Sequence, residues 1–171
     1  GPTTATLANY AEVLFEQDVT RRAFANSTLL AGGAALTLAC MALPLGYFIV
    51  WKQNPLARAL RPLIELPYAL PGVVLGVACI LIFLRPLPVL GFSIYGTLWI
   101  IFAAYLARFL TLALTPVLAG YQQIDRTIDD AAQIDGAGVV TRLRLVILPL
   151  LAAPAAAGAL LVFMTAYNEL T

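Results

Sequence analysis

Histidine is absent from the 171-residue sequence, and cysteine occurs only twice. Cys40 and Cys79 lie in separate apolar runs with no second sulfur nearby, so no metal site is predicted. The common zinc, haem and Cys/His nucleophile chemistries are excluded for the same reason. We expect both cysteines to be small core residues within helices.

Charged side chains are also scarce. Only 11% of the residues are charged and 61% are hydrophobic, whereas a soluble domain carries about a quarter charged residues. An ordinary water-soluble globule is therefore excluded, and the chain is expected to lie in a lipid bilayer. Ten basic and nine acidic residues give a net charge of +1. This balance leaves no basic excess to hold nucleic acid, so no nucleic-acid partner is expected.

Four apolar stretches approach the roughly 20 residues that a helix needs to cross a bilayer. They are residues 27–51, 62–84, about 95–118 and 146–167. The sequence therefore predicts an all-α polytopic membrane protein with four transmembrane helices. Residues 1–26 precede the first span, and their apolar side chains recur at helical spacing. This pattern predicts a short amphipathic helix on the outer surface, with an apolar face formed by Leu7, Tyr10, Ala11, Leu14 and Phe15.

The connections between the spans differ in charge. Residues 52–61 carry three positive charges and no acid, and residues 119–145 contain Arg126, Arg142 and Arg144. The short connection 85–94 is proline-rich and nearly uncharged. By the positive-inside rule the two basic connections face the cytoplasm. Alternating crossings require the first and third connections to share a side, so this topology is self-consistent.

The third connection carries the signals of a short helix. Thr127 and Asp130 have the spacing of a capping box, and Asp129 and Asp130 would complement the dipole of the first turn. Gly136 supplies a stop, together with Gly138. The expected helix has a small apolar face that cannot bury itself against lipid, so it needs a protein partner. That face is formed by Ile124, Ile128, Ala131 and Ala132.

The same connection resembles the EAA motif of ABC importer permeases. The family pattern is Glu-Ala-Ala, three residues, Gly, nine residues, Ile-x-Leu-Pro. Here Asp130-Ala131-Ala132, Gly136 and the run 146–149 match that spacing, with Asp for Glu and Val for Ile. The resemblance covers nearly the whole chain, including the block 66–76 in the second span and Asn168 to Thr171 after the fourth. The chain is most similar to ferric-iron permeases, with thiamine, phosphonate and polyamine permeases as alternatives.

The resemblance implies the core of a type I importer permease in the bacterial inner membrane. Residues 1–26 would then be periplasmic, and residues 27–171 would form the transmembrane domain. The family core has at least five helices, so a chain with four spans is expected to be truncated after the fourth. The implied partners are an ATPase subunit that binds the ATP, a periplasmic solute-binding protein, and a second permease half or a homodimer partner. This chain itself would need no cofactor, because it lacks a glycine-rich phosphate loop.

The family also implies which residues couple the chain to its ATPase. The helix in the loop at about 119–145 would dock on that subunit, and the start of the fourth span would transmit the movement. The candidate docking residues are Asp129, Asp130, Ala131, Ala132, Gly136, Leu148 and Pro149.

The second and third spans contain candidates for the solute path. Pro67, Pro71 and Gly72 interrupt the second span, which indicates either a broken helix lining the path or a packing kink. Arg108 is a costly charge inside the third span. It could snorkel to the cytoplasmic surface, or it could pair with Glu65. The candidate path residues are Pro67, Pro71, Gly72 and Arg108.

Two other functional classes remain as alternatives. An intramembrane enzyme would need paired catalytic residues in its spans, and the sequence offers no histidine and no serine with a nearby base. A passive channel would have no use for the Ala-Ala-Gly helix. We therefore expect a non-enzymatic permease, for which ferric iron is the first candidate solute.

Overall fold

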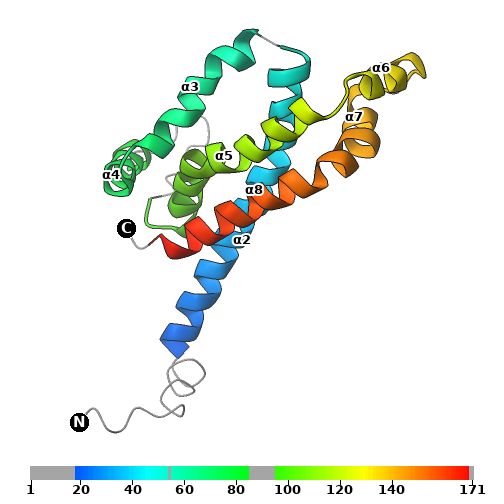
Figure 1. Cartoon of the computed structure of the whole chain (residues 1–171). Coiled ribbons are helices and arrows are strands. Elements are labelled where there is room, and N and C mark those ends of the chain that lie inside the picture. The colour runs from blue at the N-terminus through cyan, green and yellow to red at the C-terminus, as the bar shows by residue number, and fades with distance from the viewer. Residues whose placement is uncertain (1–17, 54, 85–94, 170–171) are drawn as a thin grey trace.

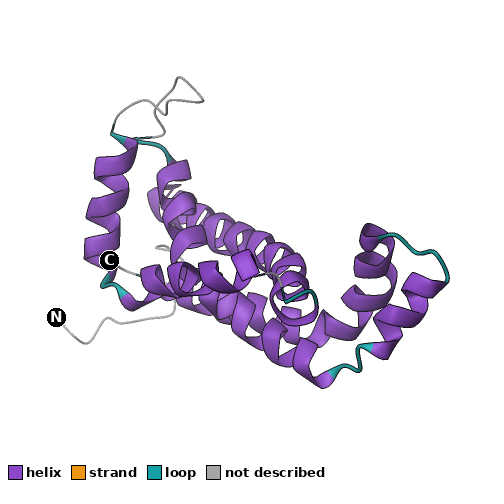
Figure 2. Cartoon of the chain, turned by 90° about the horizontal axis from the view of Figure 1, so that it is seen from above, coloured by secondary structure: helices purple, strands orange, loops and turns teal. Residues whose placement is uncertain are grey.

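The computed structural model describes residues 18–53, 55–84 and 95–169 (Figure 1). Every regular element within these ranges is a helix, as the predicted all-α fold class requires (Figure 2). The amphipathic helix predicted over residues 7–15 and the connection 85–94 lie outside the described residues.

Three long helices form the core of the molecule. They are α2 (Asp18–Gly46), α5 (Leu98–Gln123) and α8 (Leu148–Asn168), and each packs against the other two. Small residues bring them together: a Cβ added at Gly158 of α8 would lie 3.1 Å from the Cα of Ala113 in α5. Close backbone approach of this kind is how membrane helices associate without a hydrophobic driving force between them.

The first and third spans extend further than predicted. The first was expected to begin at residue 27, yet α2 begins at Asp18 and continues through the π-helical segment η3 (Tyr47–Trp51). The third was expected to end near residue 118, yet α5 reaches Gln123. Hydropathy marks only the part of a helix that suits lipid, and helical hydrogen bonding continues into the polar turns at either end. Cys79 is buried, but Cys40 is exposed, so its predicted core position is wrong.

The second predicted span is broken into two helices. Helix α3 (Pro55–Ala69) and helix α4 (Gly72–Phe83) meet at an angle of 111°. Pro71 lies at the break with φ −56° and ψ 140°, an extended conformation that ends the helical path. Within the described ranges there are thus three helices long and apolar enough to span a bilayer, or four spans if the bent pair counts as one.

The segment before the fourth span is helical as well. Helix α6 (Thr127–Ile134) is followed by α7 (Val139–Arg142) and the π-helical segment η4 (Leu143–Ile147), which runs directly into α8. The fourth helical stretch therefore begins at Val139 and not at residue 146 as predicted. Helices α6 and α7 lie at the end of the molecule opposite to the start of α2 (Figure 1).

Candidate functional site: a projecting helix and a broken span

Helix α6 forms where the sequence predicts it, but with a different cap. The Oδ1 atom of Asp125 accepts a hydrogen bond of 2.9 Å from the backbone N–H of Thr127. This bond holds the pKa of the Asp125 carboxyl below its ordinary value. The predicted capping box of Thr127 and Asp130 is wrong, since the N-cap is Arg126 and no side chain caps the helix from there. Asp125 lies closer to the first free N–H groups and satisfies one of them.

The end of α6 depends on a glycine, as predicted. Gly136 has φ +83°, a left-handed conformation that side chains with a Cβ adopt at a cost. Its N–H donates to the carbonyl of Gln133, and the N–H of Ala137 donates to that of Ala132, so two terminal carbonyls are satisfied. Gly138 has φ −65° and needs no such freedom.

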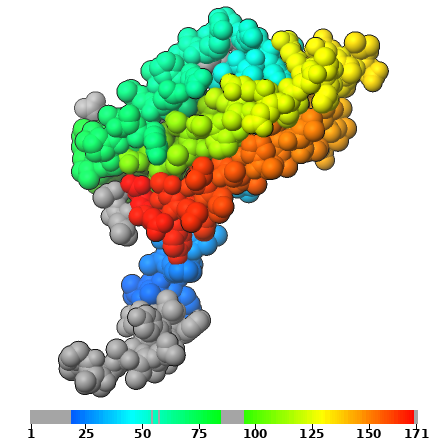
Figure 3. Space-filling view, in the orientation of Figure 1, coloured from blue at the N-terminus to red at the C-terminus, as the bar shows by residue number. Residues whose placement is uncertain are grey.

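One side of α6 is apolar and uncovered. Ile134 is 85% exposed, and Ile128 and Ala131 are exposed too. Asp130 is exposed beside them, and Ala132 is half-buried. The helix projects from the edge of the molecule (Figure 3). Among the described residues nothing covers this face, so it is available to another protein.

The opposite side of α6 is fixed by a buried charged network. Asp129 is 3% exposed, and its Oδ1 lies 3.3 Å from Nε of Arg142, which is 2% exposed. Arg142 also donates 2.6 Å to Oε1 of Gln133 and 2.8 Å to the hydroxyl of Tyr47. That hydroxyl donates a long bond of 3.4 Å to Oδ2 of Asp129. Side chains from α6, α7 and the end of the first span thus meet around one guanidinium group.

Aromatic side chains pack around Tyr47, the residue of the first span that belongs to this network. The Tyr47 ring packs edge-on against Trp51, which packs edge-on against Tyr121 of α5. Nε1 of Trp51 donates 3.2 Å to the carbonyl of Tyr121, and the Tyr121 hydroxyl donates 2.8 Å to the carbonyl of Leu43. The first and third spans are therefore tied together next to the network.

The structure separates the predicted docking residues into four groups, one of which is Gly136 alone, in the turn after α6. Asp130, Ala131 and Ala132 lie on or beside the exposed side of α6, whereas Asp129 points inward. Leu148 and Pro149 are exposed in the first turn of α8.

Sequence reasoning missed Tyr47 and did not assign Arg142 to Asp129. The signal available was an aspartate and an arginine 13 positions apart, in a connection that holds four aspartates and three arginines.

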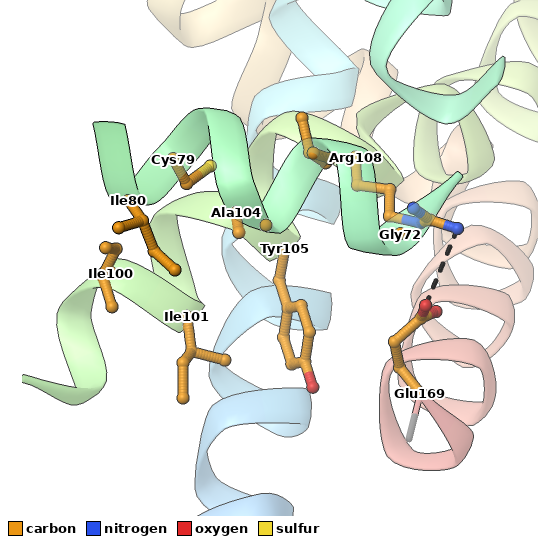
Figure 4. Close-up of a pocket in the computed structure, with 11 residues that line it drawn as sticks. Gly72, Cys79, Ile80, Ile100, Ile101, Ala104, Tyr105, Arg108 and Glu169 are labelled. Carbon is orange, nitrogen blue, oxygen red and sulfur yellow. Dashed lines mark ion pairs between the residues drawn. The ribbon is translucent and has the colours of Figure 1, made fainter. Parts of the chain in front are cut away.

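A second site lies at the break between α3 and α4. A cavity of about 530 Å³ opens there, with walls from α4, α5 and the end of α8 (Figure 4). Most of its lining is apolar, including Cys79, Ile80 and Ile101, while Arg108 and Glu169 supply the charges. Among the predicted path residues, Gly72 and Arg108 line this cavity. Pro67 and Pro71 shape the break but do not line it.

Arg108 does not pair with Glu65, so that prediction is wrong. Glu65 pairs with Arg61 one turn earlier on α3, at 2.9 Å. Nη2 of Arg108 lies 3.6 Å from Oε1 of Glu169, and Nη1 donates 3.2 Å to the carbonyl of Leu70 at the break. Arg108 lies nearer the Leu98 end of α5 than the Gln123 end, so snorkelling to the cytoplasmic end is also wrong.

These contacts explain how the break is tolerated in a membrane. A broken helix frees backbone carbonyls, which need partners in hydrocarbon. Arg108 donates a hydrogen bond to the carbonyl of Leu70. The hydroxyl of Thr111 donates a hydrogen bond of 3.0 Å to the carbonyl of Ile64. Helix α5 thus provides polar support for the bent pair.

Comparison with known proteins relates the chain as a whole to transport proteins. Residues 25–171 match a family described as the binding-protein-dependent transport system inner membrane component. A probable ABC transporter permease protein, y4fN, of Sinorhizobium fredii is 35% identical over 157 residues. The putative ferric transport system permease protein FbpB 1 of Haemophilus influenzae is 34% identical over 153 residues. The trehalose/maltose transport system permease protein MalG of Thermococcus litoralis is 30% identical over 166 residues.

These matches cover most of this chain but only part of each relative. They include 88%, 86% and 96% of the chain, and 26%, 23% and 58% of the respective relatives. The chain therefore spans less than two thirds of the length of each of these three relatives.

Proposed function

Because the chain belongs to the family of binding-protein-dependent transport system inner membrane components, we propose that it forms part of the solute path of an ABC importer and that α6 couples this path to a separate ATPase subunit. One observation carries the proposal: α6 exposes an apolar face to one side and is anchored by a buried charged network on the other. A helix held in this way can pass a force from a docked partner to the membrane helices.

The residues of α6 then take distinct roles in coupling. Ile128, Ala131 and Ile134 offer the apolar contact, and Asp130 offers a charge at its rim. Asp129 acts inside the chain, where its ion pair with Arg142 ties the docking helix to the first span through Tyr47. Gly136 turns the chain from α6 toward α7, and Leu148 and Pro149 begin the span that receives the movement.

The cavity at the broken span is the candidate path. The apolar walls, the bent α3–α4 pair and the Arg108–Glu169 ion pair lie together at the far end of α8 from the docking helix. An ion pair at 3.6 Å with both side chains less than one-fifth exposed can open or close as these helices shift. A second permease half, as a homodimer partner or within a longer chain, would complete the path, and a periplasmic binding protein would deliver the solute.

Ferric iron is our proposed solute. A relative named as a ferric transport permease supports it, although another is named for trehalose and maltose. To test it, uptake of labelled Fe³⁺ is measured in cells that produce the complete importer, with maltose, thiamine, phosphonate and polyamine as competitors. Uptake of Fe³⁺ that only unlabelled Fe³⁺ reduces is the expected result. Uptake of another solute would show that iron is the wrong solute, but it would not contradict the coupling role of α6.

The docking role is tested on the exposed face of α6. Ile134→Glu and Ala131→Trp change exposed residues of that face, on the side of α6 away from buried Asp129. Both are expected to abolish copurification of the ATPase and transport, while membrane insertion is retained. Val140→Glu is the matched control, because Val140 is 77% exposed on α7, outside the proposed contact. If both α6 variants transport normally, the docking assignment is wrong.

A further inference from the structure

A second cavity of about 530 Å³ lies away from the candidate path. It is bounded by η3, the first turns of α3 and the second half of α5. Arg58, Arg61, Thr115 and Gln122 form its polar side. The apolar side includes Val50, Leu118 and Ala119. This combination suits a ligand with an anionic group and an apolar body.

The charge in this cavity is only partly balanced within the chain. Nε of Arg61 lies 2.9 Å from Oε1 of Glu65, which is one turn later on α3. Arg58 makes no ion pair or hydrogen bond with any residue that the structure describes. Residues 52–61 contain a lysine and two arginines but no acid. The cavity therefore presents at least one positive charge that an anion can neutralise.

The position of the cavity indicates the source of that anion. Val50 lies just before Lys52, at the end of the first span, and Gln122 lies one residue before the end of α5. Both ends belong to the side that the basic connections place in the cytoplasm. This is the level of lipid headgroups, and the cytoplasmic leaflet carries anionic lipids that attract arginine and lysine.

We propose that this cavity binds the phosphate group of an anionic phospholipid from the cytoplasmic leaflet. Arg58 and Arg61 contact the phosphate, with Thr115 and Gln122 as neutral hydrogen-bonding neighbours. The upper part of the acyl chains lies against Val50, Leu118 and Ala119. The proposal rests on the proposed function and on the orientation predicted from the two basic connections.

The surroundings of the cavity favour a lipid over a free phosphate ion. An inorganic phosphate makes no favourable contact with apolar walls, whereas a phospholipid contacts both the polar and the apolar side of the cavity. Leu60 and Leu63, on the same part of α3, are exposed apolar side chains that suit contact with neighbouring acyl chains. Helix α3 thus has the charge and apolar surface of a helix near the membrane interface.

The test compares the lipids that stay bound to the purified permease–ATPase complex. The complex is reconstituted in nanodiscs of phosphatidylcholine with a minor fraction of phosphatidylglycerol, and retained lipid is counted by native mass spectrometry after extraction into detergent. We expect retention of phosphatidylglycerol over phosphatidylcholine. Arg58→Gln should weaken that retention roughly fivefold, the effect of one arginine at a charged membrane surface.

Two further variants separate the cavity from general surface charge. Ala119→Phe fills the cavity without a change in charge and should also lose the retained lipid. Arg144→Gln removes another exposed arginine, which lies outside the cavity, and should leave lipid retention unchanged. Equal retention in all variants would overturn the proposal. So would the same loss in Arg144→Gln as in Arg58→Gln, because it would show attraction to the membrane surface alone.

A competition experiment tests whether the cavity binds free inorganic phosphate and not a phospholipid. Inorganic phosphate at millimolar concentration should not displace the retained lipid. If phosphate binds the lipid-free complex and Arg58→Gln abolishes that binding, the cavity is a phosphate site and the lipid assignment is wrong. Solute uptake is measured on the same variants reconstituted in liposomes: a complex that transports normally but retains no lipid overturns only this proposal.

Discussion

The guanidinium group of Arg142 donates a hydrogen bond of 2.8 Å to the hydroxyl of Tyr47, which lies 95 residues earlier in the chain. Both side chains are almost fully buried. This bond connects the segment after the docking helix to the end of the first span. Movement of α6 therefore reaches two membrane helices, the first through Tyr47 and the fourth through the continuous helix that follows Arg142.

Removing the hydroxyl of Tyr47 should loosen this connection. Tyr47→Phe keeps the ring packing but leaves a buried donor of Arg142 without its partner, which typically costs about 1–3 kcal/mol. We expect a lower free energy of unfolding and more ATP hydrolysed per solute transported. Chemical denaturation and a coupled uptake assay measure these quantities. Tyr68→Phe, at an exposed tyrosine of α3, should change neither.

Asp129 and Arg142 should behave as one unit. Truncating either to Ala leaves an uncompensated buried charge, at a cost of roughly 3–5 kcal/mol. The double variant should lose less stability than the sum of the two single variants, because it removes both charges. Asp130→Ala is the control: it should leave the unfolding free energy nearly unchanged and weaken ATPase copurification instead. Additive effects of the Asp129 and Arg142 substitutions would contradict the network.

The two glycines after α6 should differ in their tolerance of substitution. Gly136→Ala forces a Cβ into a left-handed conformation, at a cost of about 1–2 kcal/mol. The turn should distort, with reduced transport and weaker copurification of the ATPase. Gly138→Ala meets no atom within 4 Å and has a negative φ, so it should be tolerated. Equal effects of both changes would mean that the turn does not depend on Gly136.

The contribution of Arg108 to stability and transport should depend on Glu169 and not on Glu65. Arg108→Ala removes both the ion pair and the partner of the Leu70 carbonyl, so stability and transport should fall. The exchange Arg108→Glu with Glu169→Arg should recover part of the ion-pair contribution but not the carbonyl contact. Glu65→Gln should have little effect, because its ion pair with Arg61 is half-exposed and worth little. Thermal unfolding and solute uptake distinguish these outcomes.

The orientation in the membrane can be tested with single cysteines. Cys40 and Cys79 are first replaced, which matters most for the exposed Cys40. A cysteine at Gln53, in the basic connection, should be shielded from an impermeant thiol reagent in intact cells. One at Ser93, in the connection 85–94, should be labelled. The opposite pattern would invert the predicted topology.

Local sequence signals were enough to predict the apolar helices, α6 and the turn after it, but not α7. The apolar runs located the spans, Pro67, Pro71 and Gly72 indicated either a break or a packing kink in the second, and Gly136 marked the end of α6. These features depend on a few neighbouring residues, since a proline or a left-handed glycine acts on its own turn. The ends of the spans were less accurate because helices continue beyond their apolar part.

Tertiary pairing was beyond the reach of such signals. Asp129 and Asp130 are adjacent and chemically alike, and only the position of Arg142 and Tyr47 decides which one is buried. Likewise, the sequence indicated only Glu65 as a partner for Arg108, whereas the structure pairs Arg108 with Glu169. The 111° break turns α3 and α4 relative to each other, and the end of α8 brings Glu169 to Arg108. The spacing of residues along the sequence does not predict the angle between α3 and α4.

In the proposed coupling, the uninterrupted helical stretch Val139–Asn168 would act as a lever of about 45 Å, at 1.5 Å per residue. Its backbone approaches that of α5 closely at Gly158, which we take as the fulcrum. The arm toward the docking helix is then about 29 Å and the arm toward Glu169 about 16 Å. A tilt of about 10° that moves the docking end by about 5 Å would carry the other end by about 3 Å. A displacement of that size away from Arg108 would lengthen the 3.6 Å ion pair with Glu169 beyond direct contact. The ratio of the two arms would then match the movement of α6 to the opening of one ion pair.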